Sequence, residues 1–161
     1  MQDTMGMLDP RRRLAYTLDM LFGKGSSLAL PLDRLEFTFS KRTGKVKHVM
    51  LDGRLICTFR SDGGVALTVE GARMLAKSDS FREHCIAVSN DAAKYIAEGR
   101  SVFCKHIAWH GSSIDVGSEV AVLDESGHVI AVGRAVVPSG LLKHLKEGVA
   151  VKVRGGDGTY R

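Results

Sequence analysis

Apolar residues near the start of the chain recur at the spacing of one helix face. These residues are Leu14, Leu18, Leu21 and Phe22. Asp9-Pro10 is typical of a helix start, because Asp accepts hydrogen bonds from free N–H groups and Pro is preset for the first helical position. The glycines within residues 23–25 favour a helix end. The pattern predicts a helix over residues 11–22.

The next stretch alternates between apolar and polar residues and is interrupted by turn sequences. Leu35, Phe37 and Phe39 alternate with polar neighbours, which is typical of a half-buried strand. Asp52-Gly53 is a strong signal for a tight hairpin. The pattern therefore predicts an antiparallel meander of four strands. They cover residues 35–40, 45–51, 54–60 and 65–69.

A change of pattern follows near the middle of the chain. Residues 70–77 are expected to form a short helix, and the polar residues 78–84 are interpreted as a linker. Because domain boundaries fall in such polar segments, we expect two domains. The first would cover residues 1–80 and the second residues 84–161.

The second half is expected to alternate short strands with two short helices. Ser89-Asn90-Asp91 would begin the first helix and Gly99 would end it. Residues 108–118, which carry Trp109, are interpreted as a loop. The other predicted elements are strands at 86–88 and 102–107, a hairpin of 119–124 with 128–137, a helix from 138 to 147, a strand at 149–154 and a frayed tail at 155–161.

These elements together predict an α+β protein. An N-terminal helix and a small antiparallel sheet would precede a mixed β pseudo-barrel with two short helices. Alternation with polar neighbours places several valines inside the barrel. They are Val102, Val120, Val122, Val132, Val149 and Val151.

Composition narrows the functional class only slightly. The chain has 161 residues with 23 Lys and Arg against 18 Asp and Glu, and its isoelectric point is near 9.3. A mild basic excess favours polyanions weakly, so an inert basic surface stays an equal alternative. No apolar run approaches the roughly 18–20 residues that cross a bilayer, and no N-terminal apolar stretch is typical of a signal peptide. We therefore expect a cytoplasmic protein without a membrane partner.

Candidate catalytic and metal-binding residues are scattered. The chain has three cysteines, which are Cys57, Cys85 and Cys104. Their odd number and wide spacing predict free thiols rather than disulfides or a zinc site. Cys57 and Cys104 lie in apolar runs and are expected in the core. His106 and His110 are four residues apart, but no metal-binding motif includes them. We expect no catalytic residues, no metal and no cofactor, although a cleft with close titratable groups would favour an enzyme.

Several sequence blocks of the second half resemble the PUA domain, the RNA-binding module named for pseudouridine synthases and archaeosine transglycosylases. They are IAEGRSVFCK at 96–105, GSEVAV at 117–122, GHVIAVGRA at 127–135 and GVAVKVR at 148–154. Blocks of the first half are similar to the segment before the PUA domain in archaeosine tRNA-guanine transglycosylase. They are LFGKG at 21–25, FSKRTGK at 39–45, LDG at 51–53 and LTVEGA at 67–72.

The resemblance covers residues 12–155 and concerns only the C-terminal, tRNA-gripping part of that enzyme. Its catalytic barrel, with aspartates and zinc ligands, would lie upstream and is missing from this sequence. The resemblance therefore implies either a split gene or a protein that works without the barrel.

The resemblance also implies where RNA would lie, namely against the first PUA helix, the next strand and the final strand. The implied contacts are Lys94, Gly99, Arg100, Ser101, Phe103, Lys105, Lys152 and Arg154. Glycine permits close backbone approach, Arg and Lys contact phosphates, and an aromatic ring can stack on a base. The structural alternatives stay open: Gly99 as a helix stop, Phe103 as a core residue, and Arg154 as the cap of a strand end.

Two further basic segments lie in the first half. Lys41, Arg42, Lys45 and Lys47 surround a predicted hairpin tip and would form a phosphate clamp of low sequence specificity, or else an ordinary solvated turn. Arg11-Arg12-Arg13 opens a helix, where positive charge opposes the macrodipole. An anion or a partner surface would explain that placement.

The expected function is tRNA binding, as the tRNA-gripping subunit of a split archaeosine tRNA-guanine transglycosylase. The expected partners are tRNA and a separate catalytic transglycosylase subunit, which would dock on the helix at residues 11–22. The alternative is a free-standing tRNA-binding module that serves another RNA-modification enzyme or a translation factor.

Overall fold

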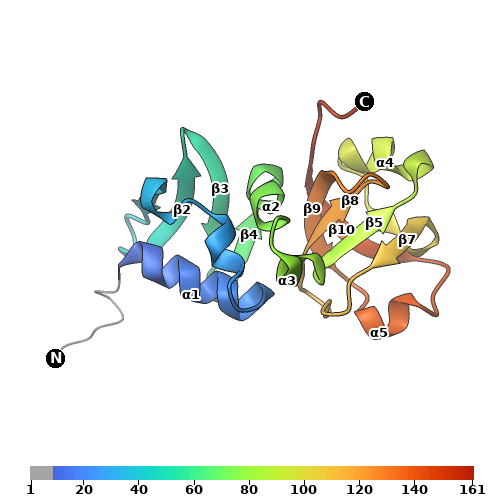
Figure 1. The fold of residues 1–161 in the computed structure, drawn as a ribbon, viewed down its shortest axis with the longest axis horizontal. Helices are drawn as coiled ribbons and strands as arrows, with labels where there is room; N and C mark the ends of the chain where they lie inside the picture. Colours follow the sequence, from blue (N-terminus) through green and yellow to red (C-terminus); the bar gives the residue numbers. More distant parts are fainter. Residues whose placement is uncertain (1–8) are drawn as a thin grey trace.

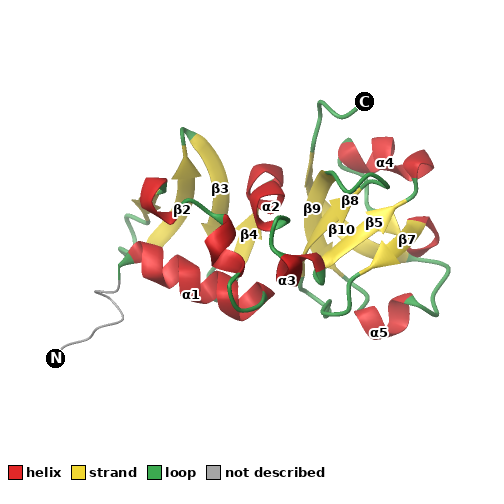
Figure 2. Ribbon diagram, in the orientation of Figure 1, coloured by secondary structure: helices red, strands yellow, loops and turns green. Residues whose placement is uncertain are grey.

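The computed structural model describes residues 9–161 and contains two separate β-sheets, which lie side by side along the long axis (Figures 1 and 2). The first sheet has the order β1-β2-β3-β4 and is antiparallel throughout. Its strands are β1 Glu36–Phe39, β2 Val46–Leu51, β3 Arg54–Phe59 and β4 Val65–Leu67. The predicted four-stranded meander is confirmed.

Helix α1, Pro10–Phe22, lies along this first sheet. The side-chain oxygen of Asp9 accepts a hydrogen bond from the Arg11 N–H and caps the helix, and Leu14 and Leu18 are buried. The Arg11 side chain donates to the carbonyls of Leu32 and Leu35 and sits over the Phe37 ring. Those contacts explain why a cation is tolerated at the positive end of this helix.

The first sheet departs from the predicted alternation at one end. Phe39 was expected to face the core beside Phe37, but it is 54% exposed. The pairing of β1 with β2 shifts register between Thr38 and Phe39. Such an irregularity inserts an unpaired residue and breaks the strict two-residue alternation of faces, so Phe39 turns outward.

The predicted linker is also different in the structure. Helix α2, Val69–Leu75, is capped by the Thr68 hydroxyl and is followed by a helical turn, α3, over Asp79–Arg82. Phe81 of α3 is fully buried, with its ring centroid 5.0 Å from that of Phe22. A lone aromatic residue in a polar run gives no periodicity, so the sequence pattern missed this core residue.

The second sheet has the order β6-β10-β9-β8-β5-β7. Strands β5 and β8 are parallel, and all other neighbours are antiparallel. The elements of this half are β5 Cys85–Val88, α4 Asn90–Ala97, β6 Val102–Phe103, β7 Ile107–His110, β8 Glu119–Leu123, β9 Val129–Ala135, α5 Ser139–Leu142 and β10 Val149–Gly156. The α+β class and the near-barrel of mixed strands with short helices are confirmed.

The central strands of the second sheet are buried on both faces. Val120 and Val122 of β8 pack inside the near-barrel, whereas Ala121 and Leu123 pack into the core of the first half. Among the predicted barrel valines, Val132 is buried but belongs to the core of the first half, and Val149 is half-buried. The two halves therefore share one hydrophobic interface through β8 and β9.

Three segments of the second half differ from the sequence expectation. The predicted strand 102–107 is broken by a 3₁₀ turn over Cys104–His106, so the following Trp109 lies in strand β7 rather than in a loop. The predicted helix over 138–147 is only one turn long. The tail is attached rather than frayed, because the Tyr160 hydroxyl donates to Asp124 Oδ2 at 2.9 Å.

Candidate nucleic-acid interface

The outer face of helix α4 carries cations grouped around one aromatic ring. The inner face of α4 is apolar and buried, so Lys94 and Tyr95 face outward, with Tyr95 50% exposed. The Lys94 Nζ and the Arg100 guanidinium carbon each lie 5.8 Å from the centre of the Tyr95 ring. Such pairs hold cations over a ring by electrostatic attraction. Arg100 is brought to this position by the turn after α4.

Gly99 makes that turn possible. Its φ of +109° lies in a region that L-residues with side chains rarely adopt, and no atom lies within 4 Å of the place where its Cβ would be. Gly99 is therefore a helix stop, as the sequence indicated, and it also leaves open surface at the end of α4.

A cleft of about 310 Å³ separates α4 from β6. Tyr95, Arg100, Ser101, Phe103 and His106 are among its lining residues. Phe103 is 42% exposed and meets the His106 ring edge-on at 6.1 Å, so it is a surface residue and not part of the core. Aromatic walls beside a guanidinium are suited to stacking an unpaired base next to its phosphate.

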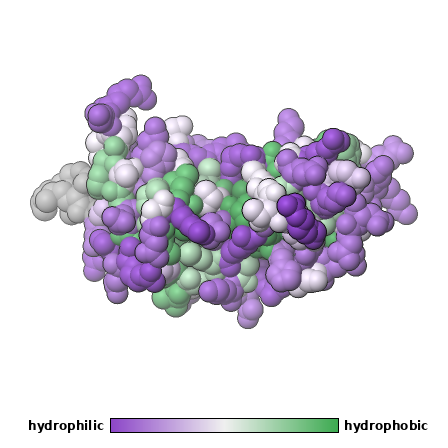
Figure 3. Space-filling view, turned by 90° about the horizontal axis from the view of Figure 1, so that it is seen from above, coloured by the Kyte–Doolittle hydropathy of each residue, from purple (hydrophilic) through white to green (hydrophobic). Residues whose placement is uncertain are grey.

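The remaining lysines of the predicted surface are also exposed. Lys105 lies on the 3₁₀ turn after β6. Lys152 lies on β10, next to Val151, whose pairing partner is Val102 of β6. The structure thus brings Lys94, Arg100, Ser101 and Phe103 together around α4 and β6, with Lys105 and Lys152 on the adjoining turn and strand. Figure 3 shows polar residues over most of this end of the molecule, viewed from above.

Arg154 is engaged elsewhere. Its guanidinium forms an ion pair with the buried carboxylate of Glu119 and also donates to the Leu67 carbonyl at 2.6 Å. The Leu67 N–H donates to the same carboxylate at 2.7 Å. Leu67 lies on β4, the edge strand of the first sheet, so the ion pair satisfies the N–H and C=O of this one edge residue. We name these three residues the Glu119–Arg154 clasp.

The basic hairpin of the first half protrudes between β1 and β2. Lys41, Arg42, Lys45 and Lys47 are exposed, and within residues 9–161 none of them has a carboxylate within 4.0 Å. The exposed ring of Phe39 lies at the base of this hairpin. The geometry presents four cations to the solvent.

Sequence reasoning did not single out Tyr95 of the α4 cleft, and it considered His106 only as a possible metal ligand. Tyr95 is an aromatic on the polar side of an amphipathic helix, and that position could have served as a signal. His106 has a buried Nδ1 without a hydrogen-bond partner in the described part of the chain. Nothing in the sequence indicated that the 3₁₀ turn would place His106 beside Phe103.

Two of the three cysteine thiols are deeply buried. Burial, followed by the charge of Glu119, raises the pKa of the Cys57 thiol to about 12, and burial raises that of Cys85 to about 12. Thiols of that kind are poor nucleophiles. Over residues 9–161 no cluster of three His, Cys, Asp or Glu side chains is placed to hold a metal ion. No helix in the same range is long and apolar enough to cross a membrane.

Each half of the chain matches a known protein family. Residues 84–156 match the PUA domain, and residues 12–81 match the patch-forming domain C2 of tRNA-guanine transglycosylase. The second half of the chain is therefore a PUA domain, and the first half is similar to the C2 domain of the transglycosylases. Both matches agree with the resemblance in the sequence, and the PUA assignment supports RNA binding.

Relatives over most of the chain are tRNA-guanine(15) transglycosylases. The protein from Methanothermobacter thermautotrophicus is 32% identical over 150 residues, which are 92% of this chain and 23% of the relative. The protein from Thermoplasma acidophilum is 34% identical over 145 residues, which are 89% of this chain and 23% of the relative. The chain thus spans about a quarter of these relatives, in their C-terminal region.

Solved structures share the fold at low identity. A conserved PUA domain protein from Thermoplasma acidophilum has a TM-score of 0.68 and 19% identity, and the match covers 91% of this chain and 88% of that one. A PUA domain from Aeropyrum pernix has a TM-score of 0.67 and 21% identity, with 92% and 82% covered. These likenesses show that both halves of the fold occur together in other proteins.

Proposed function

We propose that this chain grips tRNA on behalf of a separate catalytic tRNA-guanine transglycosylase subunit and contributes no catalytic residue itself. The observation that carries the proposal is the match of nearly the whole chain to one quarter of relatives named tRNA-guanine(15) transglycosylases. That quarter consists of the C2 and PUA domains. The catalytic part of such an enzyme would be supplied in trans.

The α4–β6 surface supports RNA binding by two kinds of contact. Lys94, Arg100, Lys105 and Lys152 would neutralise phosphates, which gives affinity without sequence information. The cleft between Tyr95 and Phe103 would accept a base that is free of pairing, because only an unstacked base exposes its faces to aromatic side chains. Ser101 and the open surface at Gly99 would let the backbone of the RNA approach closely.

The hairpin at residues 41–47 would hold a second part of the tRNA backbone. Two separated grips raise the effective concentration of the substrate at the catalytic subunit. They also fix its orientation, which lowers the barrier of the reaction without any bond-making by this chain. Helix α1 is the proposed docking element for the catalytic subunit, because Tyr16 and Met20 are exposed on it.

A free-standing tRNA-binding module is the second candidate function. Two solved PUA proteins favour this function, because the match covers 88% and 82% of their solved chains. In that case the same surfaces would hold RNA for another modification enzyme or for translation.

Binding to tRNA is the first test of the proposal. The purified chain should bind a tRNA transcript, and the logarithm of the association constant should fall linearly with the logarithm of the salt concentration. Labelled guanine should not be incorporated into tRNA by the chain alone. Incorporation by the chain alone would show that it is an enzyme in its own right.

Co-purification separates the two candidates. A tagged chain expressed in its host should retain a transglycosylase that lacks the C2 and PUA domains, and deletion of its gene should lower archaeosine in tRNA. Unchanged archaeosine levels together with the absence of a bound transglycosylase would favour the free-standing module.

A further inference from the structure

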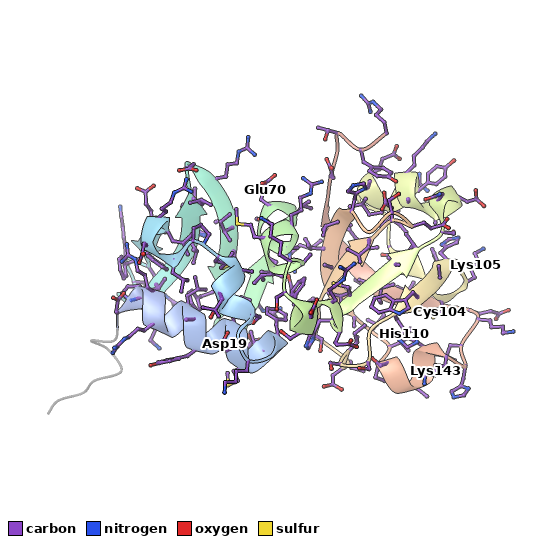
Figure 4. The ribbon with its side chains drawn as sticks, viewed as in Figure 1. Asp19, Glu70, Cys104, Lys105, His110 and Lys143 are labelled. Carbon is purple, nitrogen blue, oxygen red and sulfur yellow. The ribbon has the colours of Figure 1, made fainter. Side chains whose placement is uncertain are left out.

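A second groove lies on the opposite side of the segment that follows β6. It has a volume of about 430 Å³ and runs between β7 and the residues of α5 with the turn behind it. Figure 4 shows Cys104, Lys105, His110 and Lys143 along this side of the molecule. The lining residues are Cys104, Lys105, Ile107, Ala108, Trp109, His110, Leu142, Lys143, Leu145 and Lys146. Of these residues, only Lys105 belongs to the surface already proposed to bind RNA.

The floor of the groove contains an exposed aromatic ring. Trp109 on edge strand β7 is 45% exposed, although its strand partner Ala87 on β5 anchors the backbone. Leu145 is 40% exposed in the same groove. An exposed indole next to a second apolar side chain in a concave site is a feature of binding surfaces rather than of inert ones.

The rim of the groove is positively charged. Lys105, Lys143 and Lys146 are exposed, no carboxylate lines the groove, and none of the three lysines forms an ion pair within residues 9–161. His110 Nδ1 lies 2.8 Å from the Gly111 carbonyl, which can only accept a hydrogen bond. The proton of a neutral His110 therefore sits on Nδ1, and Nε2 remains free to accept.

We propose that this groove binds a nucleotide of single-stranded RNA, with the base stacked on Trp109 and the flanking phosphates held by the lysines. The positive charge of the rim favours a polyanion such as RNA. The exposed Trp109 ring favours an RNA with unpaired bases, because only such bases can stack on it. A volume of about 430 Å³ is in the usual range for small-ligand pockets and suits one nucleotide rather than a duplex.

Continuity with the α4–β6 surface strengthens the assignment. Phe103 and His106 line the first cleft, whereas Lys105 between them lines the groove. A strand that leaves the first cleft across the 3₁₀ turn would meet Lys105 and then Trp109. This inference rests on the proposed RNA-binding function and extends it, because it assigns a second base-stacking position.

Trp109 is the only tryptophan of the chain, so its fluorescence reports on this groove alone. The full chain is titrated with a six-nucleotide single-stranded RNA, a blunt RNA duplex of the same strand length and a hexaglutamate peptide. Binding of the two RNAs is followed in parallel by anisotropy of a label on the RNA. We expect the single strand to quench Trp109, and the duplex and the peptide to leave its emission unchanged.

Variants provide the second measurement. Trp109→Ala should weaken binding of the single strand about tenfold, whereas Trp109→Phe should retain most of it because a phenyl ring still stacks. Lys143→Glu with Lys146→Glu should reduce Trp109 quenching strongly. Lys77→Glu with Lys24→Glu changes the net charge equally at exposed sites outside both clefts and should have a much smaller effect.

The outcomes separate this inference from the proposed function. If the labelled single strand binds while Trp109 emission stays constant and Trp109→Ala binds equally well, the groove is not a nucleotide site, and RNA binding by α4 and β6 stands. If hexaglutamate quenches Trp109 as well as RNA does, the groove accepts acidic peptide and the assignment is wrong. If no RNA binds by anisotropy, both the inference and the proposed function are wrong.

Discussion

The basic hairpin of the first half and the α4–β6 surface of the PUA domain carry similar charge in very different settings. The hairpin presents Lys41, Arg42, Lys45 and Lys47 to the solvent. The PUA surface holds Lys94 and Arg100 against the Tyr95 ring beside a cleft walled by Phe103. Charge alone attracts a phosphate backbone, whereas charge next to exposed rings can also select unpaired bases.

The comparison teaches that net charge identifies an RNA-binding surface poorly. Both surfaces are basic in the sequence, but only one is built so that a cation and a ring are held together by the fold. Long flexible side chains on a hairpin lose rotamer entropy when they bind, whereas a guanidinium already placed over a ring loses less. We therefore expect the PUA surface to contribute more affinity and all of the selectivity.

The largest effect is expected on the PUA surface. Lys94→Ala with Arg100→Ala should lower the affinity for tRNA about 50-fold at 0.1 M salt and reduce the salt slope by about two, since two phosphate contacts disappear. The measurement is a salt titration by fluorescence anisotropy. Lys24→Ala with Lys77→Ala removes the same charge and serves as the control. Equal losses in the two double variants would show that only net charge matters.

The clasp between the two halves should affect stability. Glu119→Ala leaves the guanidinium of Arg154 and the Leu67 N–H without their acceptor, which should lower the free energy of unfolding by about 2 kcal/mol. Urea denaturation measures this change. Glu36→Ala removes an exposed carboxylate of β1 and should have almost no effect. A stability of Glu119→Ala equal to that of the unmodified chain would contradict the structural role of the clasp.

A smaller effect is expected at the hairpin. Lys41→Ala with Lys45→Ala should weaken binding about tenfold and reduce the salt slope by about one, if the tip makes a single phosphate contact. The loss should be the same for tRNA and for an unrelated RNA duplex, because we expect the tip to contact only the RNA backbone. A loss confined to tRNA would show that the hairpin distinguishes tRNA from other RNA, which contradicts the expectation that all of the selectivity comes from the PUA surface.

The smallest effect concerns acid stability of the PUA domain. Burial raises the pKa of Asp124, but hydrogen bonds from the His128 N–H and the Tyr160 hydroxyl outweigh burial and hold the pKa below its usual value. A carboxyl with a lowered folded pKa stabilises the fold above its unfolded pKa of about 3.9 and loses that contribution as the pH falls through the folded value.

Asp124→Asn should therefore lower the free energy of unfolding by about 1 kcal/mol at pH 7, and the difference should vanish at strongly acidic pH. Thermal unfolding followed from pH 7 downward measures it. Tyr160→Phe should reproduce part of the loss at pH 7. A difference that stays constant down to pH 2 would mean that Asp124 acts by packing rather than by charge.

Much of the fold follows from local patterns in the sequence. The periodicity of Leu14 and Leu18 predicts α1, and Asp52-Gly53 predicts the β2–β3 hairpin, because both signals depend only on near neighbours. Gly99 adopts the positive φ that a helix-ending glycine permits. Apart from Arg154, which is held in the clasp, and Ser101, which is half-buried, the predicted site residues are exposed, and their contacts with RNA stay predictions.

The features that sequence patterns missed depend on distant neighbours. Arg154 meets Glu119 and Leu67, which lie far away in the sequence, so its role in the clasp has no local signal. Phe81 and Trp109 are isolated aromatic residues, and only packing decides that the first is buried and the second exposed. A periodic pattern indicates which face of a helix or strand a residue occupies, but an isolated aromatic residue belongs to no such pattern.

The clasp can form only late in the synthesis of the chain. Strand β4 is made early, but the groups that satisfy its outer edge come from β8 and from β10, which is the last strand of the chain. Until Arg154 has been added, the first sheet has an open edge that can pair with another chain. A nascent chain that stalls before β10 is thus exposed to aggregation through a sheet that is otherwise finished.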